Sequence, residues 1–163
     1  MAHEPPSTQE TLSLTSQAKT MQARIVTDRG EMVFRFFPDD APVTVASFIK
    51  LARSKFYDGL TFHRVVPGFV IQGGCPEGTG TGGPGYNLKA EFNKNLHDAG
   101  AVAMARAQSP DSAGSQFYIC TEDAHFLDHQ YTVFGHLTSG LDVARKVQAD
   151  DVMRSVTIEP LPA

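Results

Sequence analysis

Residues 62–74 read Phe-His-Arg-Val-Val-Pro-Gly-Phe-Val-Ile-Gln-Gly-Gly, and this stretch decides how the chain folds. Two short runs rich in Phe, Val and Ile flank a Pro-Gly pair, a pattern that predicts a strand, a tight turn and a second strand. Pro67 restricts its own φ and Gly68 tolerates a positive φ, so together they suit the turn. Because side chains alternate along a strand, Arg64 should share one face with apolar neighbours. A lone arginine in a strand is usually a surface residue with a snorkelling stem, but the rest of the chain indicates another role.

Length and composition set the class of protein. A chain of 163 residues is expected to form one domain, because it can bury about two-thirds of its unfolded surface. The net charge of −4 and the lack of a basic stripe argue against nucleic-acid binding. No run reaches the roughly 18 apolar residues of a membrane helix, and no secretory signal is apparent, so we expect a cytoplasmic protein without a membrane segment. Cys75 and Cys120 are too few for a disulfide framework and should be reduced thiols.

The N-terminal region differs in composition from the rest. Residues 1–20 are rich in Ser, Thr, Gln and Pro and poor in apolar residues, which predicts a disordered tail. The folded domain should therefore cover residues 21–163. It should open with a β-hairpin, because strand patterns at residues 23–27 and 31–37 flank a short turn that ends in Gly30.

A helix is predicted after the hairpin. Apolar residues recur every three or four positions from Val45 to Phe56, which gives one apolar stripe. Asp40 or Thr44 could cap its N-terminus, and Pro42 is compatible with a first turn.

Further short strands dominate the second half. Residues 73–86 are dense in glycine but lead to Pro84 and a polar loop, which favours a loop folded over the sheet and not a phosphate-binding loop. Strands are predicted at residues 101–106, 115–120, 131–137 and 155–158. A helix should begin at a Ser139–Asp142 capping box and run to Val147. Many short strands with two helices favour a closed barrel or a sandwich.

Five segments, in this order and spacing, strongly resemble the cyclophilins: residues 62–74, 80–83, 103–106, 114–120 and 133–135. The similarity extends over nearly everything from Met21 to Ile158. It implies a mainly β protein, a closed eight-stranded antiparallel β-barrel capped by two α-helices. It also implies peptidyl-prolyl cis-trans isomerase activity that assists protein folding.

The resemblance also implies the residues of the site. Arg64 matches the catalytic arginine of the family, and Gln72, which should orient it, and Gln116 match the polar groups that hold the substrate. The wall of the proline pocket is matched by Phe69, Val70, Tyr118 and Leu127. The strand along which the peptide backbone runs is matched by Ala105, Arg106 and Ala107, and Phe126 and Tyr131 are further substrate-binding positions.

Four of these positions depart from the best-known eukaryotic members and look more like bacterial cyclophilins. Tyr118 stands where we expect Phe, Phe126 where they have Trp, Tyr131 where they have His and Arg106 where they have Asn. A phenyl ring cannot donate the hydrogen bond that an indole N–H can donate, so cyclosporin should bind with weakened affinity.

These residue types suit rotation about an X-Pro bond. The barrier is about 18–20 kcal/mol because the nitrogen lone pair is delocalised into the carbonyl group. In the twisted transition state this lone pair is localised, so a charged donor such as Arg64 should bind that state best. The chemistry calls for no nucleophile, metal or cofactor. We expect a monomer whose partners are proline-containing peptides and unfolded or refolding proteins.

Several alternatives remain open from the residues alone. The same groove could serve a proline-binding module or a holdase without turnover, which an intact Arg64 disfavours. A lipocalin-like barrel would need an open apolar interior, and the many Phe side chains argue against one. His125 and His129 flank Asp128 at a metal-like spacing, but their loop context favours surface histidines.

Overall fold

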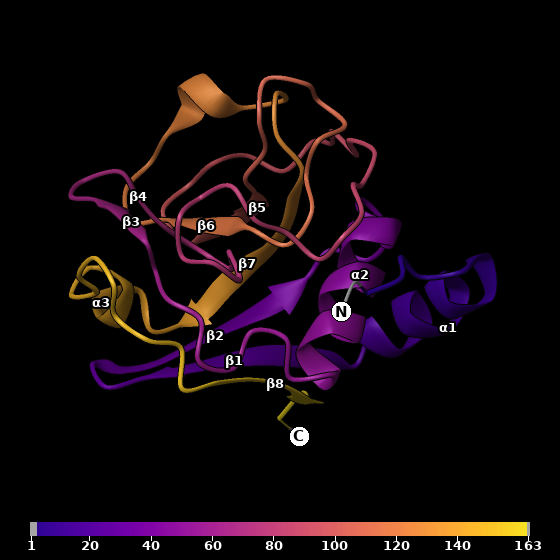
Figure 1. Ribbon diagram of the computed structural model, residues 1–163, viewed down its shortest axis with the longest axis horizontal. Helices are drawn as coiled ribbons and strands as arrows, with labels where there is room; N and C mark the ends of the chain where they lie inside the picture. Colours follow the sequence, from indigo (N-terminus) through magenta and orange to yellow (C-terminus); the bar gives the residue numbers. More distant parts are fainter. Residues whose placement is uncertain (1–2, 163) are drawn as a thin grey trace.

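One antiparallel sheet contains every strand of the computed structural model, which describes residues 3–162. Its spatial order is β3-β4-β6-β5-β7-β2-β1-β8, and the sheet curls around a filled interior (Figure 1). The strands are β1 Met21–Thr27, β2 Gly30–Phe36, β3 Arg64–Val66, β4 Val70–Gly73, β5 Ala101–Met104, β6 Phe117–Cys120, β7 Val133–Ser139 and β8 Ser155–Pro160. The helices are α1 Thr8–Ala18, α2 Pro42–Arg53 and α3 Leu141–Ala144, with a 3-10 turn η1 at His125–Leu127. None of the helices within residues 3–162 is long and apolar enough to cross a membrane.

The β corner forms as the sequence predicts. Arg64 pairs with Gln72 and Val66 with Val70 across β3 and β4. Gly68 has a φ of +73°, and the N–H of Phe69 donates to the carbonyl of Val66 at 3.0 Å to close the turn. The corner is therefore a tight hairpin that fixes the register of Arg64 against Gln72.

The register continues across the sheet and separates two clusters. Gln72 pairs with Tyr118 on β6, and Tyr118 pairs with Ala103 on β5, so the row that starts at Arg64 crosses four strands on one face. The neighbouring row, in which Ile71 pairs with Ile119, faces the interior instead. Tyr118 and Ala103 belong to a smaller cluster on the outer side of the sheet. Strand alternation thus places the row of Arg64 outside the core.

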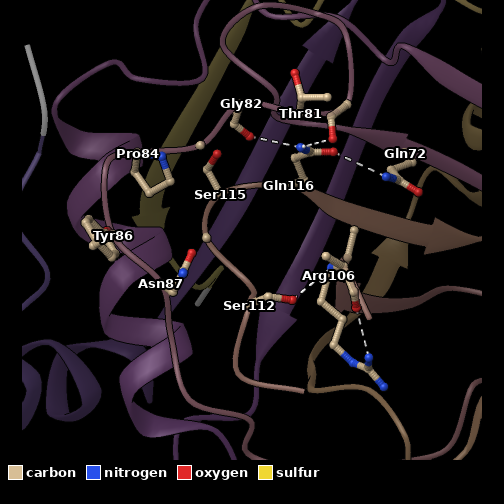
Figure 2. A pocket seen from close by; sticks show the side chains of 15 residues that line it. Gln72, Thr81, Gly82, Pro84, Tyr86, Asn87, Arg106, Ser112, Ser115 and Gln116 are labelled. Atoms are coloured by element: carbon tan, nitrogen blue, oxygen red, sulfur yellow. Dashed lines mark hydrogen bonds between the residues drawn. The ribbon is translucent and has the colours of Figure 1, made fainter. Parts of the chain in front are cut away.

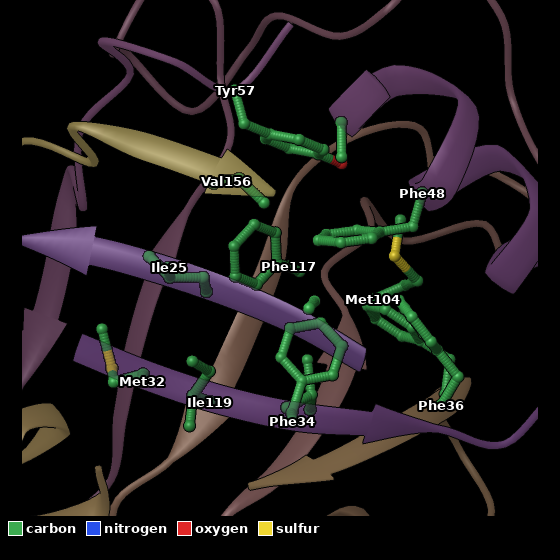
Figure 3. Close-up of a cluster of buried hydrophobic side chains, with 14 of the residues drawn as sticks. Ile25, Met32, Phe34, Phe36, Phe48, Tyr57, Met104, Phe117, Ile119 and Val156 are labelled. Carbon is green, nitrogen blue, oxygen red and sulfur yellow. The ribbon is translucent and has the colours of Figure 1, made fainter. Parts of the chain in front are cut away.

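Aromatic rings fill the interior. Phe48 of α2 stacks on Tyr57 with ring centroids 5.0 Å apart, and it contacts Phe117 edge-on at 5.7 Å. Phe34 and Phe134 pack edge-on against each other at 5.9 Å. Phe34, Phe48, Tyr57 and Phe117 gather in one cluster (Figure 3). Phe34, Phe117 and Phe134 are fully buried. This packing leaves no room inside the curled sheet for a lipocalin-like ligand site among the described residues.

The sheet curls strongly, but its two edges differ from a fully closed barrel. Strands β3 and β8 lie at opposite ends of the order, and within residues 3–162 no hydrogen-bonded ladder joins them. An isolated bridge between Thr61 and Val152 links the segments that precede these strands. The prediction of eight antiparallel strands is confirmed. Backbone hydrogen bonds between residues 59–62 and 150–153 join the two ends of the sheet, among them Phe62 N–H to the carbonyl of Asp151 at 2.9 Å and Met153 N–H to the carbonyl of Leu60 at 2.8 Å.

The start of α2 corrects one prediction. The N-cap residue is Ala41, whose methyl group cannot accept a hydrogen bond, and neither Asp40 nor Thr44 caps the helix. Instead the carboxylate of Glu91 accepts from the N–H groups of Val43 at 3.1 Å and Thr44 at 2.8 Å. A negative group at this end also complements the helix dipole. A distant loop, not the local sequence, therefore supplies the cap.

The N-terminal segment corrects a second prediction. Thr8–Ala18 forms α1 and is not disordered; its N-terminus carries a capping box between Ser7 and Glu10. The helix lies beside α2 (Figure 1), where Lys50 pairs with Glu10 at 3.1 Å. The few apolar residues that seemed too sparse to order the segment find a partner surface on α2. The parts of the domain prediction that fall on residues 1–2 and 163 lie outside the described residues.

The third helix is shorter than predicted. It spans Leu141–Ala144, and its N-cap is Gly140 with a φ of +92°, not a Ser139–Asp142 capping box. A Cβ at Gly140 would lie only 2.3 Å from the carbonyl oxygen of Glu31, so glycine is required there. Residues 3–162 contain three α-helices where the sequence analysis expected two, and α1 is the one that it did not expect.

Candidate active site

A cavity of about 220 Å³ opens on the outer face of the sheet beside the β corner. Its position follows from the register, because Arg64, Gln72 and Tyr118 occupy one row across β3, β4 and β6. Nine of the predicted site residues line it: Arg64, Phe69, Val70, Gln72, Ala105, Arg106, Tyr118, Leu127 and Tyr131. The structure therefore gathers most of the predicted site around one hollow.

A second cavity of about 430 Å³ adjoins the first and shares Gln72, Ala105 and Arg106 with it. The predicted residues Gln116 and Ala107 line this neighbouring cavity and not the first. The glycine-rich loop at residues 80–83 forms its opposite side (Figure 2). The sequence analysis predicted the loop but not the cavity, since the loop's distance from Arg106 is set by the fold.

Hydrogen bonds connect Arg64 to this loop. The guanidinium of Arg64 donates to Oε1 of Gln72 at 3.3 Å, and Nε2 of Gln72 donates to Oε1 of Gln116 at 3.3 Å. Nε2 of Gln116 then donates to the carbonyl oxygens of Gly80 and Gly82, each at 2.9 Å (Figure 2). The two bonds at 3.3 Å are long, so Arg64 is oriented by Gln72 without being held tightly.

The loop itself is anchored by Cys75. The N–H groups of Gly80 and Gly82 donate to its sulfur at 3.3 Å and 3.2 Å. Burial raises the pKa of the Cys75 thiol, but backbone N–H donors from Gly82, Gly80 and two further loop residues outweigh it, so the pKa is lowered. Cys120 is the opposite case, since burial raises its pKa to about 12. Both thiols are free and buried, as predicted.

The two arginines at the cavity differ in their partners. The guanidinium of Arg106 donates to the carbonyl oxygens of Ala107 and Gln108 at 3.0 Å and of Gln130 at 2.8 Å. It also lies over the ring of Tyr131, 4.5 Å from the ring centre. Arg64 is exposed, and Gln72 uses only one of its donors. Within the part of the chain that the structure describes, Arg64 therefore has four of its five donors free, whereas three backbone carbonyl groups hold Arg106 in place.

Phe126 completes the rim of the cavity without lining it. Its ring is 69% exposed and stacks on Phe69 with centroids 5.6 Å apart. It sits on η1 next to Leu127, which does line the cavity. Nearby, His125 and His129 do not converge on one point, because His125 bonds to Asp128 while His129 bonds to the carbonyl of Asn93.

The structure adds two residues that the sequence analysis missed. Nε2 of His97 lies 2.8 Å from the hydroxyl oxygen of Tyr118, and its Nδ1 lies 3.0 Å from Oδ1 of Asp128. His97 comes from an irregular segment without periodicity, 21 residues before Tyr118 in the chain. No local sequence pattern could have predicted that His97 contacts Tyr118 and Asp128.

Comparisons with known proteins give a consistent result. The family model described as "Cyclophilin type peptidyl-prolyl cis-trans isomerase/CLD" matches residues 22–161. The chain is 53% identical over 137 residues to "Peptidyl-prolyl cis-trans isomerase B" of Bacillus subtilis, covering 83% of this chain and 95% of that protein. It is 49% identical over 143 residues to "Peptidyl-prolyl cis-trans isomerase" of Helicobacter pylori, covering 85% and 87%.

Solved structures show the same likeness. A crystal structure of a cyclophilin type peptidyl-prolyl cis-trans isomerase from Cryptosporidium parvum superposes with a TM-score of 0.81 at 29% identity, covering 88% of this chain and 99% of that one. A second structure of that protein, determined in the presence of the dipeptide Ala-Pro, gives a TM-score of 0.75 at 29% identity, with coverages of 87% and 99%.

Proposed function

The chain belongs to the cyclophilin-type peptidyl-prolyl cis-trans isomerases, and we propose that Arg64 is the group through which it lowers the barrier to rotation about X-Pro bonds. The observation that carries this proposal is the row of Arg64, Gln72 and Tyr118 along one side of the 220 Å³ cavity. That row places a charged donor at the edge of an apolar hollow.

The cavity suits a proline ring. Phe69, Val70, Tyr118 and Leu127 offer apolar surface, and the ring of a bound proline would be gripped while its nitrogen faces Arg64. The planar peptide bond has little electron density to offer at nitrogen, whereas the twisted bond has a localised lone pair there. A hydrogen bond from Arg64 would therefore form in the twisted state and lower the barrier selectively.

The peptide backbone would lie between the two cavities. Ala105 and Arg106 line both of them, and the small side chain of Ala105 allows a ligand backbone to approach closely. Gln116 accepts from Gln72 while Gln72 orients Arg64, and Gln116 would hold a peptide carbonyl by exchanging one of its two bonds to the carbonyl oxygens of Gly80 and Gly82 for a bond to the peptide. The Ala-Pro dipeptide named with the Cryptosporidium parvum structure supports proline-containing peptides as substrates of this chain.

In the cell, such an activity would act on unfolded or refolding chains. Uncatalysed prolyl isomerisation takes about 10–100 s, which makes it a slow step that a catalyst can shorten. The alternative function, a module that binds proline peptides without turnover, would use the same groove but would not require the Arg64 guanidinium.

A protease-coupled isomerisation assay on short X-Pro peptides tests the proposal. We expect Arg64→Ala to lower kcat/KM by about 10²-fold, the usual effect of removing one donor to a developing charge, while the Kd for a proline peptide changes little. Arg53→Ala is a matched control, since Arg53 lies on α2 and donates to Gln17, away from both cavities. If Arg64→Ala keeps the wild-type rate, or wild type binds the peptide without accelerating isomerisation, the proposed role of Arg64 is wrong.

A further inference from the structure

His97 lies directly behind the proline pocket and takes no part in the chemistry proposed above. Its side chain is fully buried, and both ring nitrogens have a partner. One partner is the hydroxyl of Tyr118, which lines the pocket. The other is the carboxylate of Asp128, whose Oδ1 also accepts from the backbone N–H of His97 at 2.7 Å. A fully buried titratable group with two such contacts calls for an explanation.

The partners determine the tautomer of His97. A carboxylate only accepts hydrogen bonds, so Nδ1 must carry the proton that is shared with Asp128. Nε2 then has a free lone pair and accepts from the hydroxyl of Tyr118. Burial raises the pKa of that hydroxyl far above its ordinary value, which keeps Tyr118 in the neutral form that can donate. Because the carboxylate of Asp128 can only accept, Nδ1 of His97 donates to it, and Nε2 of His97 accepts from the Tyr118 hydroxyl.

His97 joins two walls of the pocket that belong to different elements. Tyr118 stands on β6, whereas Leu127 and Phe126 belong to η1. Asp128 is the C-cap residue of η1, and the backbone N–H of its N-cap residue, Ala124, donates to the carbonyl of His97 at 2.8 Å. His97 therefore contacts the β6 wall with its Nε2 and both ends of η1 with its other polar groups.

We propose that His97 is a positioning residue that holds Tyr118 and η1 at the spacing that a bound proline ring requires. This inference rests on the proposed function, because it takes the cavity of about 220 Å³ to be the proline site. His97 would not touch the substrate. It would act through Tyr118 on one side and through Leu127 on the other.

Protonation of His97 would disturb this arrangement. A second proton on Nε2 would point at the Tyr118 hydroxyl, which would have to turn and leave its own hydrogen without a partner in a buried site. Burial lowers the pKa of His97 below its ordinary value of 6.5, although Asp128 opposes the shift. The titratable or charged groups around His97 and its two hydrogen-bond partners are Asp128, Tyr118, His125, Asp98, Tyr131 and the guanidinium of Arg106. The neutral form therefore holds the pocket at neutral pH, and proline affinity should fall as the pH falls through the pKa of His97.

The test compares peptide affinity and KM from pH 5 to 8, using an X-Pro peptide that has no titratable group in this range. In wild type both Kd and KM should rise as the pH falls. His97→Gln should raise Kd and KM by about three- to tenfold at pH 7.5, as expected for one lost buried hydrogen bond, with kcat changed less than about twofold. The dependence of Kd on pH should also disappear. Tyr118→Phe keeps the ring and removes the hydroxyl, so it should abolish the pH dependence even if His97→Gln folds poorly.

His125→Gln is the matched control, because His125 bonds to the second oxygen of the same carboxylate but is exposed. It should keep the wild-type Kd and its pH dependence. The proposal is overturned if His97→Gln folds and keeps the wild-type Kd at every pH, or if His125→Gln alone removes the pH dependence. Because Kd is measured without turnover, these outcomes are distinct from a failure of Arg64 to act in catalysis.

Discussion

At the scale of single residues, the two guanidinium groups beside the pocket have different roles because they have different partners. Arg106 is tied to three backbone carbonyl groups and to the ring of Tyr131, so three of its five N–H donors hold residues 107, 108 and 130, while its buried Nε has no partner within residues 3–162. Arg64 has a single long bond to Gln72. Under the proposed mechanism, two identical side chains in one site would thus serve structure in one case and chemistry in the other.

This difference predicts opposite kinetic effects. Arg106→Ala should raise KM by roughly three- to tenfold, because the peptide-binding segment loses its anchor, and should leave kcat within about threefold. Steady-state isomerisation kinetics of Arg106→Ala and Arg64→Ala show whether each substitution changes KM or kcat. A collapse of kcat in Arg106→Ala as large as that in Arg64→Ala would show that Arg106 also acts on the transition state.

A second prediction at this scale concerns the rim. Phe126→Trp restores an indole N–H beside Phe69 and should tighten cyclosporin binding by about three- to tenfold, the worth of one added hydrogen bond. The chain contains no other Trp, so fluorescence of the new indole reports binding directly. For wild type, competition with a labelled peptide gives the reference affinity. Equal affinities would show that the missing donor does not limit binding.

At the scale of elements, the glycine-rich loop is held by the sulfur of Cys75 on one side and by the amide of Gln116 on the other. The same two residues, Gly80 and Gly82, donate their N–H groups to Cys75 and accept from Gln116. Cys75 is thereby linked through the loop to Gln116, a residue proposed to hold the substrate. The loop needs glycine for close backbone packing, and it needs an acceptor at position 75 to keep its shape.

Substitutions of Cys75 should separate these needs. Cys75→Ser keeps an acceptor and should preserve KM, whereas Cys75→Val removes it and should raise KM by about three- to tenfold. Because the pKa of Cys75 is lower in the folded state than in the unfolded chain, the free energy of unfolding should rise with pH up to about 9. In Cys75→Ser, the free energy of unfolding measured by denaturant titration should no longer rise between pH 7 and 9. An unchanged slope would assign it to another group.

The start of α2 gives a prediction for a second element. Glu91 accepts from the N–H groups of Val43 and Thr44 and from the Thr44 hydroxyl, and so serves as the N-terminal cap. Glu91→Ala should lower the free energy of unfolding by about 1–2 kcal/mol, the usual effect of losing a helix cap. Chemical denaturation measures it, with Glu122→Ala as a control on an exposed surface carboxylate.

At the scale of the whole molecule, α1 is an addition that covers one side of α2 and lies outside the part of the chain matched by the family model, residues 22–161. Its contacts include the pair between Glu10 and Lys50 and the hydrogen bond from Arg53 to Gln17. None of these residues lines either cavity. The helix should therefore contribute to stability and leave the proline pocket unchanged.

Removal of residues 1–19 tests this expectation. The truncated chain should lose roughly 2–8 °C in Tm, which corresponds to about 1–2 kcal/mol for a protein of this size. Its kcat/KM for short X-Pro peptides should stay within about twofold of the full chain. A large loss of activity below the Tm would show that α1 supports the site and not only the fold.

The sequence by itself determined the β corner and the strand register near it, and it predicted the residues of the candidate site. These depend on local rules: Pro67 and Gly68 allow one kind of turn, and alternation then puts Arg64 opposite Gln72 on the outer face. The resemblance, which extends from Met21 to Ile158, supplied the remaining predicted pocket residues, and the structure gathers most of them around the same cavity.

Only the tertiary structure decided which distant residues support that site. His97 beneath Tyr118, Glu91 at the start of α2 and the ordering of α1 all depend on partners far away in the chain. Their segments have no periodicity, or too few apolar residues, to indicate what they will contact. A hydrogen bond or a packed face gains free energy only when the fold brings its partner within reach, so local sequence patterns do not contain it.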